Sequence, residues 1–183
     1  MGDLPQPTPR IIFRRLRTDD LDRFDGLDRD EGVMQFLDWE APSRAAQREI
    51  VAERLRQEER WPGYGCFPAE SLAGDFLGWF ALTARDRPEV PDLGYRLHRR
   101  YWGQGLATEG ALALINYAFA TLGVQGVEAD TMAVNHASRR VMTHCGLTYV
   151  RTFHGDFDDP LPGTEQGEVL YRITREQWLA RAE

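Results

Sequence analysis

The chain has 183 residues, of which 42% are hydrophobic and 28% are charged, and its formal net charge is -7. This length and composition are typical of one globular domain that buries roughly two-thirds of its unfolded surface. The acidic balance argues against a general nucleic-acid-binding protein, which needs a basic face. It suits cationic partners such as amines, or it could serve solubility alone.

The cysteines and the N-terminus bear on where the protein works. Cys66 and Cys145 lie far apart in the sequence, in apolar surroundings and without metal-ligand spacing. They are therefore predicted to be small core residues of a protein in a reducing compartment. The first residues lack the basic region of a signal peptide, and no stretch approaches the length of a membrane span. We expect a cytoplasmic protein that binds neither nucleic acid nor membrane.

The N-terminal part of the chain is expected to be a tail followed by a strand. Residues 1–9 contain three prolines and are predicted to form a flexible tail, which leaves residues 10–183 as a single domain. Residues 10–17 alternate between apolar and polar side chains, which predicts a first strand. In that strand, Ile12 and Leu16 are the candidates for facing the core.

Capping residues and hydrophobic periodicity mark the remaining elements. Thr18 and Ser43 are predicted helix N-caps, with helices that reach Asp28 and residue 60. The other predicted elements are strands at residues 64–68, 76–82, 93–97, 127–134, 147–153 and 168–174, and helices at residues 32–37, 105–122, 135–145 and 175–182. This mixed order of strands and helices indicates an α/β fold around one mixed sheet.

The most informative segment is a glycine turn between an apolar strand and an apolar helix. It reads Arg100-Tyr101-Trp102-Gly103-Gln104-Gly105-Leu106-Ala107. Such a turn can present backbone N–H groups to a phosphate, and the following helix adds its positive N-terminal end. Thr108 stands where a dinucleotide fingerprint needs a third glycine, and no Gly-Lys-Ser/Thr of a Walker loop is present. A plain tight turn is the alternative interpretation.

A second signature, Asn135-His136-Ala137-Ser138, opens another helix about thirty residues later. Taken with the turn Arg100-x-x-Gly103-x-Gly105, it resembles the motifs of the GNAT superfamily of N-acetyltransferases. The similarity spans residues 10–180. A longer set of residues resembles more narrowly the branch that contains the ribosomal-protein alanine N-acetyltransferases: Gly94, Tyr95, Trp102 to Glu109, Asn135, Ser138 and Cys145 to Leu147.

The resemblance implies a fold and a reaction. The fold would be a mixed, mostly antiparallel, splayed sheet of about six to seven strands flanked by helices. The reaction would move an acetyl group from acetyl-CoA to a primary amine by direct attack in a ternary complex, without a metal. The acceptor could be a protein N-terminus or a small cationic amine such as an aminoglycoside or a polyamine. A homodimer is a further family expectation. The alternative is a non-catalytic acyl-CoA-binding sensor on the same fold.

The resemblance also implies which residues bind coenzyme A. The amides of the glycine turn would cradle the pyrophosphate, while those of Tyr95 and Leu97 would bind the pantetheine arm and polarise the thioester carbonyl. Asn135 could bind the pantetheine or only cap its helix. The full predicted set is Tyr95, Leu97, Arg100, Tyr101, Trp102, Gly103, Gln104, Gly105, Leu106, Ala107, Asn135 and Ser138.

The resemblance also bears on the general acid. Many relatives carry a tyrosine where this chain has Met142, so Ser138 becomes the candidate general acid for the departing thiolate. Its hydroxyl could instead bond to a carbonyl one turn back. Neither cysteine sits in a Cys/His/Asp arrangement, which argues against an acyl-enzyme.

The general base must be chosen among several acidic residues. A carboxylate or a water relay must take a proton from the amine, and Asp156 is ranked first. The acidic loop 156–168 that contains it could also be only a solvated turn. The other candidates are Asp92, Glu109, Glu128, Asp130 and Asp158, with His136, His144 and His154 as groups that titrate near neutrality.

Overall fold

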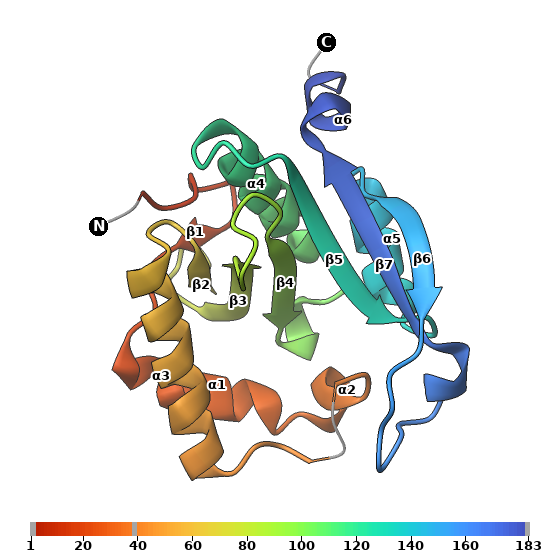
Figure 1. Ribbon diagram of the computed structural model, residues 1–183. Helices are drawn as coiled ribbons and strands as arrows, with labels where there is room; N and C mark the ends of the chain where they lie inside the picture. The colour runs from red at the N-terminus through yellow and green to blue at the C-terminus, as the bar shows by residue number, and fades with distance from the viewer. Residues whose placement is uncertain (1–2, 38–39, 182–183) are drawn as a thin grey trace.

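Seven strands form one twisted sheet in the computed structural model, which describes residues 3–37 and 40–181. Their order across the sheet is β1-β2-β3-β4-β5-β7-β6 (Figure 1). The bounds are Ile12–Phe13 for β1, Gly65–Glu70 for β2, Phe76–Thr83 for β3, Asp92–Leu97 for β4, Gly126–Met132 for β5, Thr148–Phe153 for β6 and Glu168–Thr174 for β7. The predicted α/β fold with a mixed sheet is therefore confirmed.

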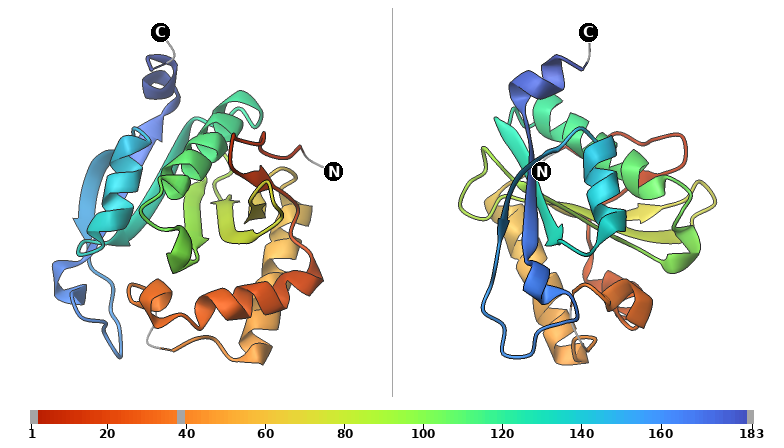
Figure 2. Two further views of the ribbon diagram at one scale, coloured as in Figure 1. Left: turned by 180° about the vertical axis from the view of Figure 1, so that it is seen from behind. Right: turned by 90° about the vertical axis from the view of Figure 1, so that its right-hand side faces the viewer.

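Helices cover both faces of this sheet. Seen from behind, α4 and α5 cover one face, while α3 packs on the opposite side against β2 (Figure 2). The shorter α1 and α2 lie below the sheet (Figure 1). The α-helical bounds are Leu21–Asp28 for α1, Glu31–Met34 for α2, Arg44–Arg60 for α3, Leu106–Ala120 for α4, His136–His144 for α5 and Arg175–Leu179 for α6.

The sheet opens between β4 and β5. These two strands are parallel, and a single residue pair, Asp92 with Glu128, joins them. All the other neighbouring strands are antiparallel, and β5 stays paired with β7 along its whole length. Beyond Asp92 the two strands diverge, so β4 turns one edge of its backbone toward the gap. This is the predicted splay, and it creates space in the middle of the sheet.

Two apolar clusters hold the helices to the sheet. Under α4, Leu114, Ile115 and Phe119 are buried against the strands. Gly110 allows the closest approach, because a Cβ there would lie 2.1 Å from Cζ of Phe80. The second cluster joins α1 and α3 to the other face through residues that include Phe24, Leu27, Val51, Cys66 and Trp79. Cys66 and Cys145 are both buried and free, as predicted.

The first strand and the first helix differ from the prediction. Strand β1 has two residues, and Ile12 faces outward, because Ile11 and Phe13 take the inward positions of the alternation. Leu16 is buried, as predicted. Thr18 begins a 3-10 turn instead of capping α1, since the Asp20 carboxylate accepts the Arg17 amide and fixes that turn. Ser43 does cap α3, accepting the amide of Ala46 at 3.2 Å.

The segment before β1 lies against α4. The Tyr117 hydroxyl donates to the carbonyl of Asp3 at 2.7 Å, and the Thr8 hydroxyl donates to Glu109 at 2.5 Å. Pro5 is buried. Residues 3–9, predicted as a flexible tail, are thus docked on α4 in this structure. Over the ranges 3–37 and 40–181, no helix combines the length and the apolar composition that crossing a membrane requires.

Candidate active site

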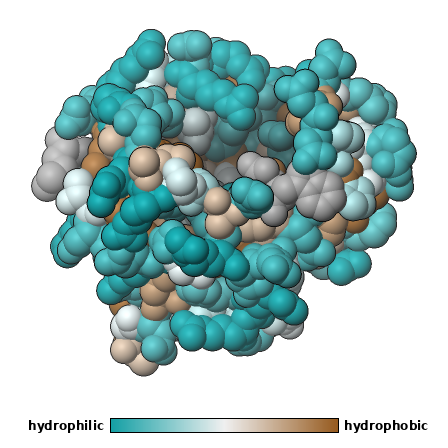
Figure 3. All heavy atoms as spheres, turned by 90° about the horizontal axis from the view of Figure 1, so that it is seen from below, coloured by the Kyte–Doolittle hydropathy of each residue, from teal (hydrophilic) through white to brown (hydrophobic). Residues whose placement is uncertain are grey.

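A cavity of about 390 Å³ occupies the gap between β4 and β5 and extends to α2 and α5. Seen from below, the surface is mainly hydrophilic, with apolar side chains visible in the hollow of this face (Figure 3). The cavity brings together these residues predicted to bind coenzyme A: Tyr95, Leu97, Trp102, Gly103, Ala107, Asn135 and Ser138. The remaining predicted residues, Arg100, Tyr101, Gln104, Gly105 and Leu106, lie in the adjoining turn and do not line it.

The glycine turn has the conformation that anion binding requires. Gly103 and Gly105 have φ values of 70° and 77°, which is the left-handed region that favours glycine. The first hydrogen bond of α4 runs from the Glu109 amide to the Gly105 carbonyl at 3.0 Å. The amides of residues 106–108 therefore have no partner within the helix. A Cβ on Gly103 would meet nothing within 4 Å, so the space beside Gly103 is open.

Side-chain hydrogen bonds to carbonyls of the glycine turn and of the end of β4 stabilise the turn. The Gln104 side chain donates to the Arg100 carbonyl at 2.8 Å, and the Trp102 indole donates to the Leu97 carbonyl at 2.8 Å. The Arg10 guanidinium donates to the Gln104 carbonyl at 2.9 Å and to Glu109 at 2.7 Å. Sequence reasoning missed Arg10, because no local pattern connects it to a turn more than ninety residues away.

Glu109 is occupied by these contacts and does not line the cavity. Burial alone would raise its pKa, but hydrogen bonds from Thr8 and Arg10 hold the pKa below its ordinary value. A carboxylate held in this way is a poor acceptor for a substrate proton. Arg100 is exposed, and its guanidinium lies over the Tyr101 ring at 4.9 Å from the centroid.

Asn135 and Ser138 both face the cavity from the start of α5. The Asn135 side chain accepts the Ser138 amide at 3.1 Å, which makes it the N-cap, and donates to the Thr131 hydroxyl at 3.1 Å. The Ser138 hydroxyl lies 2.9 Å from the phenol oxygen of Tyr95. Among the described residues, the recorded partner of this hydroxyl is therefore the Tyr95 phenol, and not the carbonyl one turn back that was the alternative expectation. Met142 is buried and adds an apolar wall.

Tyr95 is a functional side chain that sequence reasoning missed, because only its backbone was predicted to act. Burial raises the pKa of its phenol to about 12, although the hydrogen bond with Ser138 opposes that rise. The phenol is therefore protonated at neutral pH. Its partner lies forty-three residues away on another element, so no spacing in the sequence could have indicated the pair.

Among the candidate bases, Asp130 is the carboxylate on the cavity wall. A second cavity of about 210 Å³ lies on the α3 side and shares the wall residues Trp79, Leu93, Gly94 and Asp130. Asp130 can thus be reached from both spaces. Asp156 is exposed on the loop between β6 and β7 and lines neither cavity, so its catalytic role stays a prediction.

Two other candidate carboxylates are held by arginines. Glu128 is buried and accepts from Arg87 at 3.0 Å and from Arg172 at 2.6 Å. Asp92 pairs with Arg85 at 2.7 Å, and burial raises the pKa of Asp92 despite that pair. Both acids stabilise the point where β4 and β5 join. Neither lines the larger cavity, although Asp92 lines the second one beside Asp130.

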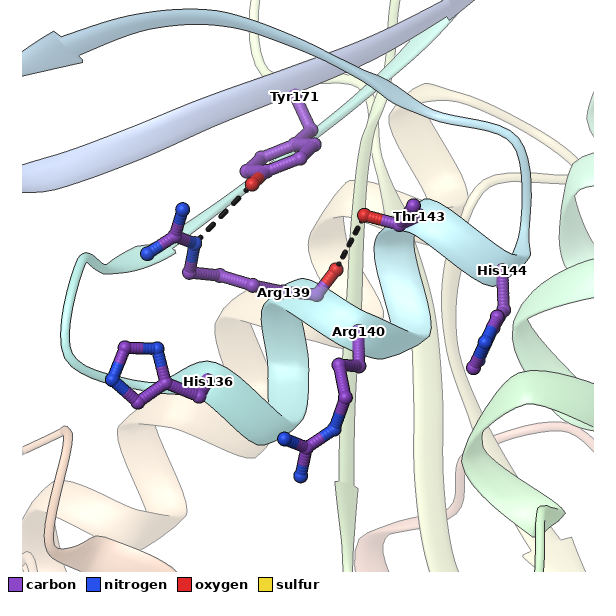
Figure 4. Close-up of a pocket in the computed structure, with 6 residues that line it drawn as sticks. All are labelled: His136, Arg139, Arg140, Thr143, His144 and Tyr171. Atoms are coloured by element: carbon purple, nitrogen blue, oxygen red, sulfur yellow. Dashed lines mark hydrogen bonds between the residues drawn. The ribbon is translucent and has the colours of Figure 1, made fainter.

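The outer side of α5 carries two of the candidate histidines (Figure 4). His136 and His144 line a surface pocket with Arg139 and Tyr171, and the Arg139 guanidinium donates to the Tyr171 hydroxyl at 3.2 Å. Neither histidine lines the cavity that Ser138 lines. The described ranges also contain no group of three or more His, Cys, Asp or Glu side chains placed to hold a metal ion.

A buried polar contact links the cavity to the helices below the sheet. Arg96 lines the cavity and donates to the Asp28 carboxylate at the end of α1. Asp28 also accepts from the Gln47 side chain of α3 at 3.0 Å. Asp28 and Gln47 are both buried. The sequence offered no sign of this contact, because its three members are distant in the chain.

Comparison with known proteins gives the site a context. Residues 10–148 match the family described as "Acetyltransferase (GNAT) domain". The chain is 44% identical over 169 residues to the FsC-acetyl coenzyme A-N(2)-transacetylase of Aspergillus fumigatus, an alignment that covers 84% of this chain and 68% of that protein.

Solved structures with this fold extend the comparison. A spermidine N-acetyltransferase from Vibrio cholerae, in complex with CoA and spermine, superposes with a TM-score of 0.79 at 15% identity, covering 94% of this chain and 99% of that one. The ribosomal alpha-N-protein acetyltransferase RimL, in complex with coenzyme A, gives a TM-score of 0.77 at 18% identity, covering 93% and 97%. At these identities the structural likeness concerns the fold alone.

Proposed function

Because the chain belongs to the GNAT acetyltransferase family and is therefore an acetyltransferase that acts with acetyl-CoA, we propose that it acetylates an amine nitrogen of the kind called N(2) in the name of its Aspergillus relative. The open glycine turn at the start of α4, beside a cavity in the splayed sheet, carries the donor half of this proposal. The acceptor half rests on the 44% identity to a transacetylase whose name specifies an N(2) nitrogen. A non-catalytic sensor does not fit relatives that are named as transacetylases and N-acetyltransferases.

The residues around the cavity fit direct transfer between two bound substrates. Gly103 and the free amides of α4 hold the phosphates of acetyl-CoA, and the β4 backbone beside Tyr95 and Leu97 faces the acyl end. Asp130 accepts the proton that the amine loses as its nitrogen bonds to the acetyl carbon. Ser138 gives a proton to the sulfur, which keeps the electron pair of the broken carbon–sulfur bond. Solvent returns a proton to Ser138 and takes one from Asp130.

Asp156 is the alternative base, and it would need the loop between β6 and β7 to approach the cavity. The family resemblance further supports a homodimer and a reaction without a metal. The acidic composition and the free, buried cysteines support a cytoplasmic location.

An acceptor panel tests this function directly. Purified protein is mixed with acetyl-CoA and one of three acceptors: FsC (the compound in the name of the Aspergillus relative), spermidine, or a peptide bearing a free N-terminus. The release of the coenzyme A thiol is then followed. We expect FsC to give the highest kcat/KM. Turnover restricted to the peptide or to spermidine would overturn the N(2) assignment. Tight binding of coenzyme A without turnover on any amine would overturn amine acetylation itself.

A further inference from the structure

The environment of Ser138 contains one group for which the reaction above has no role. The Tyr95 phenol projects from β4 across the opening of the sheet to α5, where its oxygen lies 2.9 Å from Oγ of Ser138 and 3.3 Å from the Ser138 carbonyl. The Tyr95 ring packs beside the buried Phe80 ring, with centroids 6.1 Å apart. The core therefore fixes where the phenol oxygen lies.

This geometry limits the directions in which the Ser138 hydroxyl can point. A hydroxyl has one hydrogen to donate and two lone pairs to accept with. When the phenol donates to Oγ, the serine's own O–H is free to turn toward the cavity that it lines. When the phenol instead gives its one hydrogen to the Ser138 carbonyl at 3.3 Å, the serine donates to the phenol and its O–H is directed away from that cavity. The contact with Oγ is the shorter of the two, at 2.9 Å. The phenol thus controls whether Ser138 can donate to a sulfur atom.

We infer that Tyr95 is a positioning residue, which donates its phenol hydrogen bond to Ser138 and thereby directs the Ser138 O–H at the sulfur of coenzyme A. The inference rests on the proposed function, in which Ser138 serves the leaving sulfur. Met142, one turn further along α5, is a buried wall residue that cannot donate a hydrogen bond. The phenol reaches this helix from β4 and acts through the serine.

The thiol of bound coenzyme A reports this arrangement without any acceptor. A hydrogen bond donated to sulfur favours the thiolate, so it lowers the pKa of the bound thiol. We would titrate that thiol by thiolate absorbance in the wild type, in Tyr95→Phe, in Ser138→Ala and in the double variant. The protein's own thiols titrate later, because burial raises the pKa of Cys66 to about 11 and that of Cys145 to about 12.

We expect the bound thiol to be more acidic than free coenzyme A in the wild type. Each single variant should reduce its thiolate population at a given pH by about tenfold, which is one pH unit. The double variant should match Ser138→Ala alone, because Tyr95 acts through Ser138. With acetyl-CoA and a working acceptor, Tyr95→Phe should lower kcat and leave the KM for acetyl-CoA within about twofold.

Matched controls separate this role from folding. Tyr95→Phe keeps the ring beside Phe80 and should melt close to the wild-type temperature. Tyr149→Phe removes an exposed phenol that bonds to Thr152 on β6, and it should leave the bound thiol unchanged. A wild-type thiol pKa in Tyr95→Phe, or a double variant whose effect is the sum of the singles, would overturn the inference. Failure of the wild type to bind coenzyme A would instead overturn the proposed function.

Discussion

The two sides of the cavity are built in different ways. The donor side consists of β4, the glycine turn, α4, β5 and α5, and it offers backbone amides and helix starts to the ligand. The acceptor side, so named from the proposed function, consists of α2 and residues 35–37, and α1 and α3 support it through side chains that meet from distant segments. One such meeting is at Asp28, whose carboxylate accepts from both Arg96 and Gln47.

This difference teaches which parts of the enzyme can change. A backbone site suits a ligand that stays the same in every reaction, since its shape depends on glycines and caps more than on particular side chains. A side-chain site can be altered by single substitutions, so acceptor choice can vary while acetyl-CoA binding is kept. Changing a residue on one side and measuring a property of the other side separates the two.

The largest expected effect comes from the buried contact on the acceptor side. Asp28→Ala leaves Arg96 without its carboxylate and Gln47 without an acceptor. Removing one partner of a buried ion pair costs about 3 kcal/mol or more. We expect urea unfolding to show a loss of about 3 kcal/mol in stability. The KM for the amine should rise, because Arg96 lines the cavity, whereas coenzyme A affinity should stay near the wild-type value.

Helix α1 supplies a control for this change. Asp25 pairs with the exposed Arg29 one turn later at 2.8 Å. Asp25→Ala should cost well under about 1 kcal/mol, as is usual for a surface pair. Equal losses of stability in Asp25→Ala and Asp28→Ala would contradict the special role of the buried contact.

The next effect concerns the donor side. Gly103→Val forces a β-branched residue into a left-handed backbone and puts two methyl groups into the space reserved for phosphate. We expect the Kd for coenzyme A, measured by calorimetry, to rise at least about a hundredfold, which is about 2.7 kcal/mol. Gly74 has a φ of 87° and equally open surroundings in the turn between β2 and β3. Gly74→Val therefore carries the same backbone strain and should leave coenzyme A affinity intact.

The donor side could be predicted from the sequence because its determinants are local. The residues that bend the turn, Gly103 and Gly105, lie within two positions of each other and directly before α4. Asn135 caps α5 three residues before Ser138. Such features leave a fixed spacing in the sequence. The same locality made α3 predictable, since Ser43 caps it directly.

The rest could not be predicted because it depends on contacts between distant residues. Tyr95 meets Ser138, and Arg10 meets Glu109, only after the sheet has assembled. Glu109 illustrates the consequence: the sequence made it a candidate base, whereas its carboxylate is occupied by Thr8 and Arg10 from outside α4. Asp156 and Asp130 were both candidate bases in the sequence. Of the two, only Asp130 lines the cavity, which opens where β4 splays from β5.

A smaller effect distinguishes the two candidate bases. Asp130→Asn keeps the size of the side chain and removes its ability to accept a proton. We expect kcat for the working acceptor to fall between about tenfold and a hundredfold, with the KM for acetyl-CoA nearly unchanged. Asp156→Asn should leave kcat within about twofold, because that side chain is exposed and outside the cavity. The reverse order of effects would restore Asp156 as the base.

The smallest effect is the response of the acceptor side to acid. Asp20, next to α1, accepts from Arg14 and from the Arg17 amide while it is almost fully buried. Burial alone would raise its pKa, but these hydrogen bonds hold the pKa below the ordinary value. Its stabilisation is therefore complete above the unfolded pKa of about 3.9 and is lost as pH falls through the lower folded value. Asp20→Asn keeps an oxygen that can accept from Arg14 and Arg17, so it should lose only about 1 kcal/mol at neutral pH. Its melting temperature should then fall less steeply than that of the wild type as the solution becomes more acidic, and parallel curves would contradict this role.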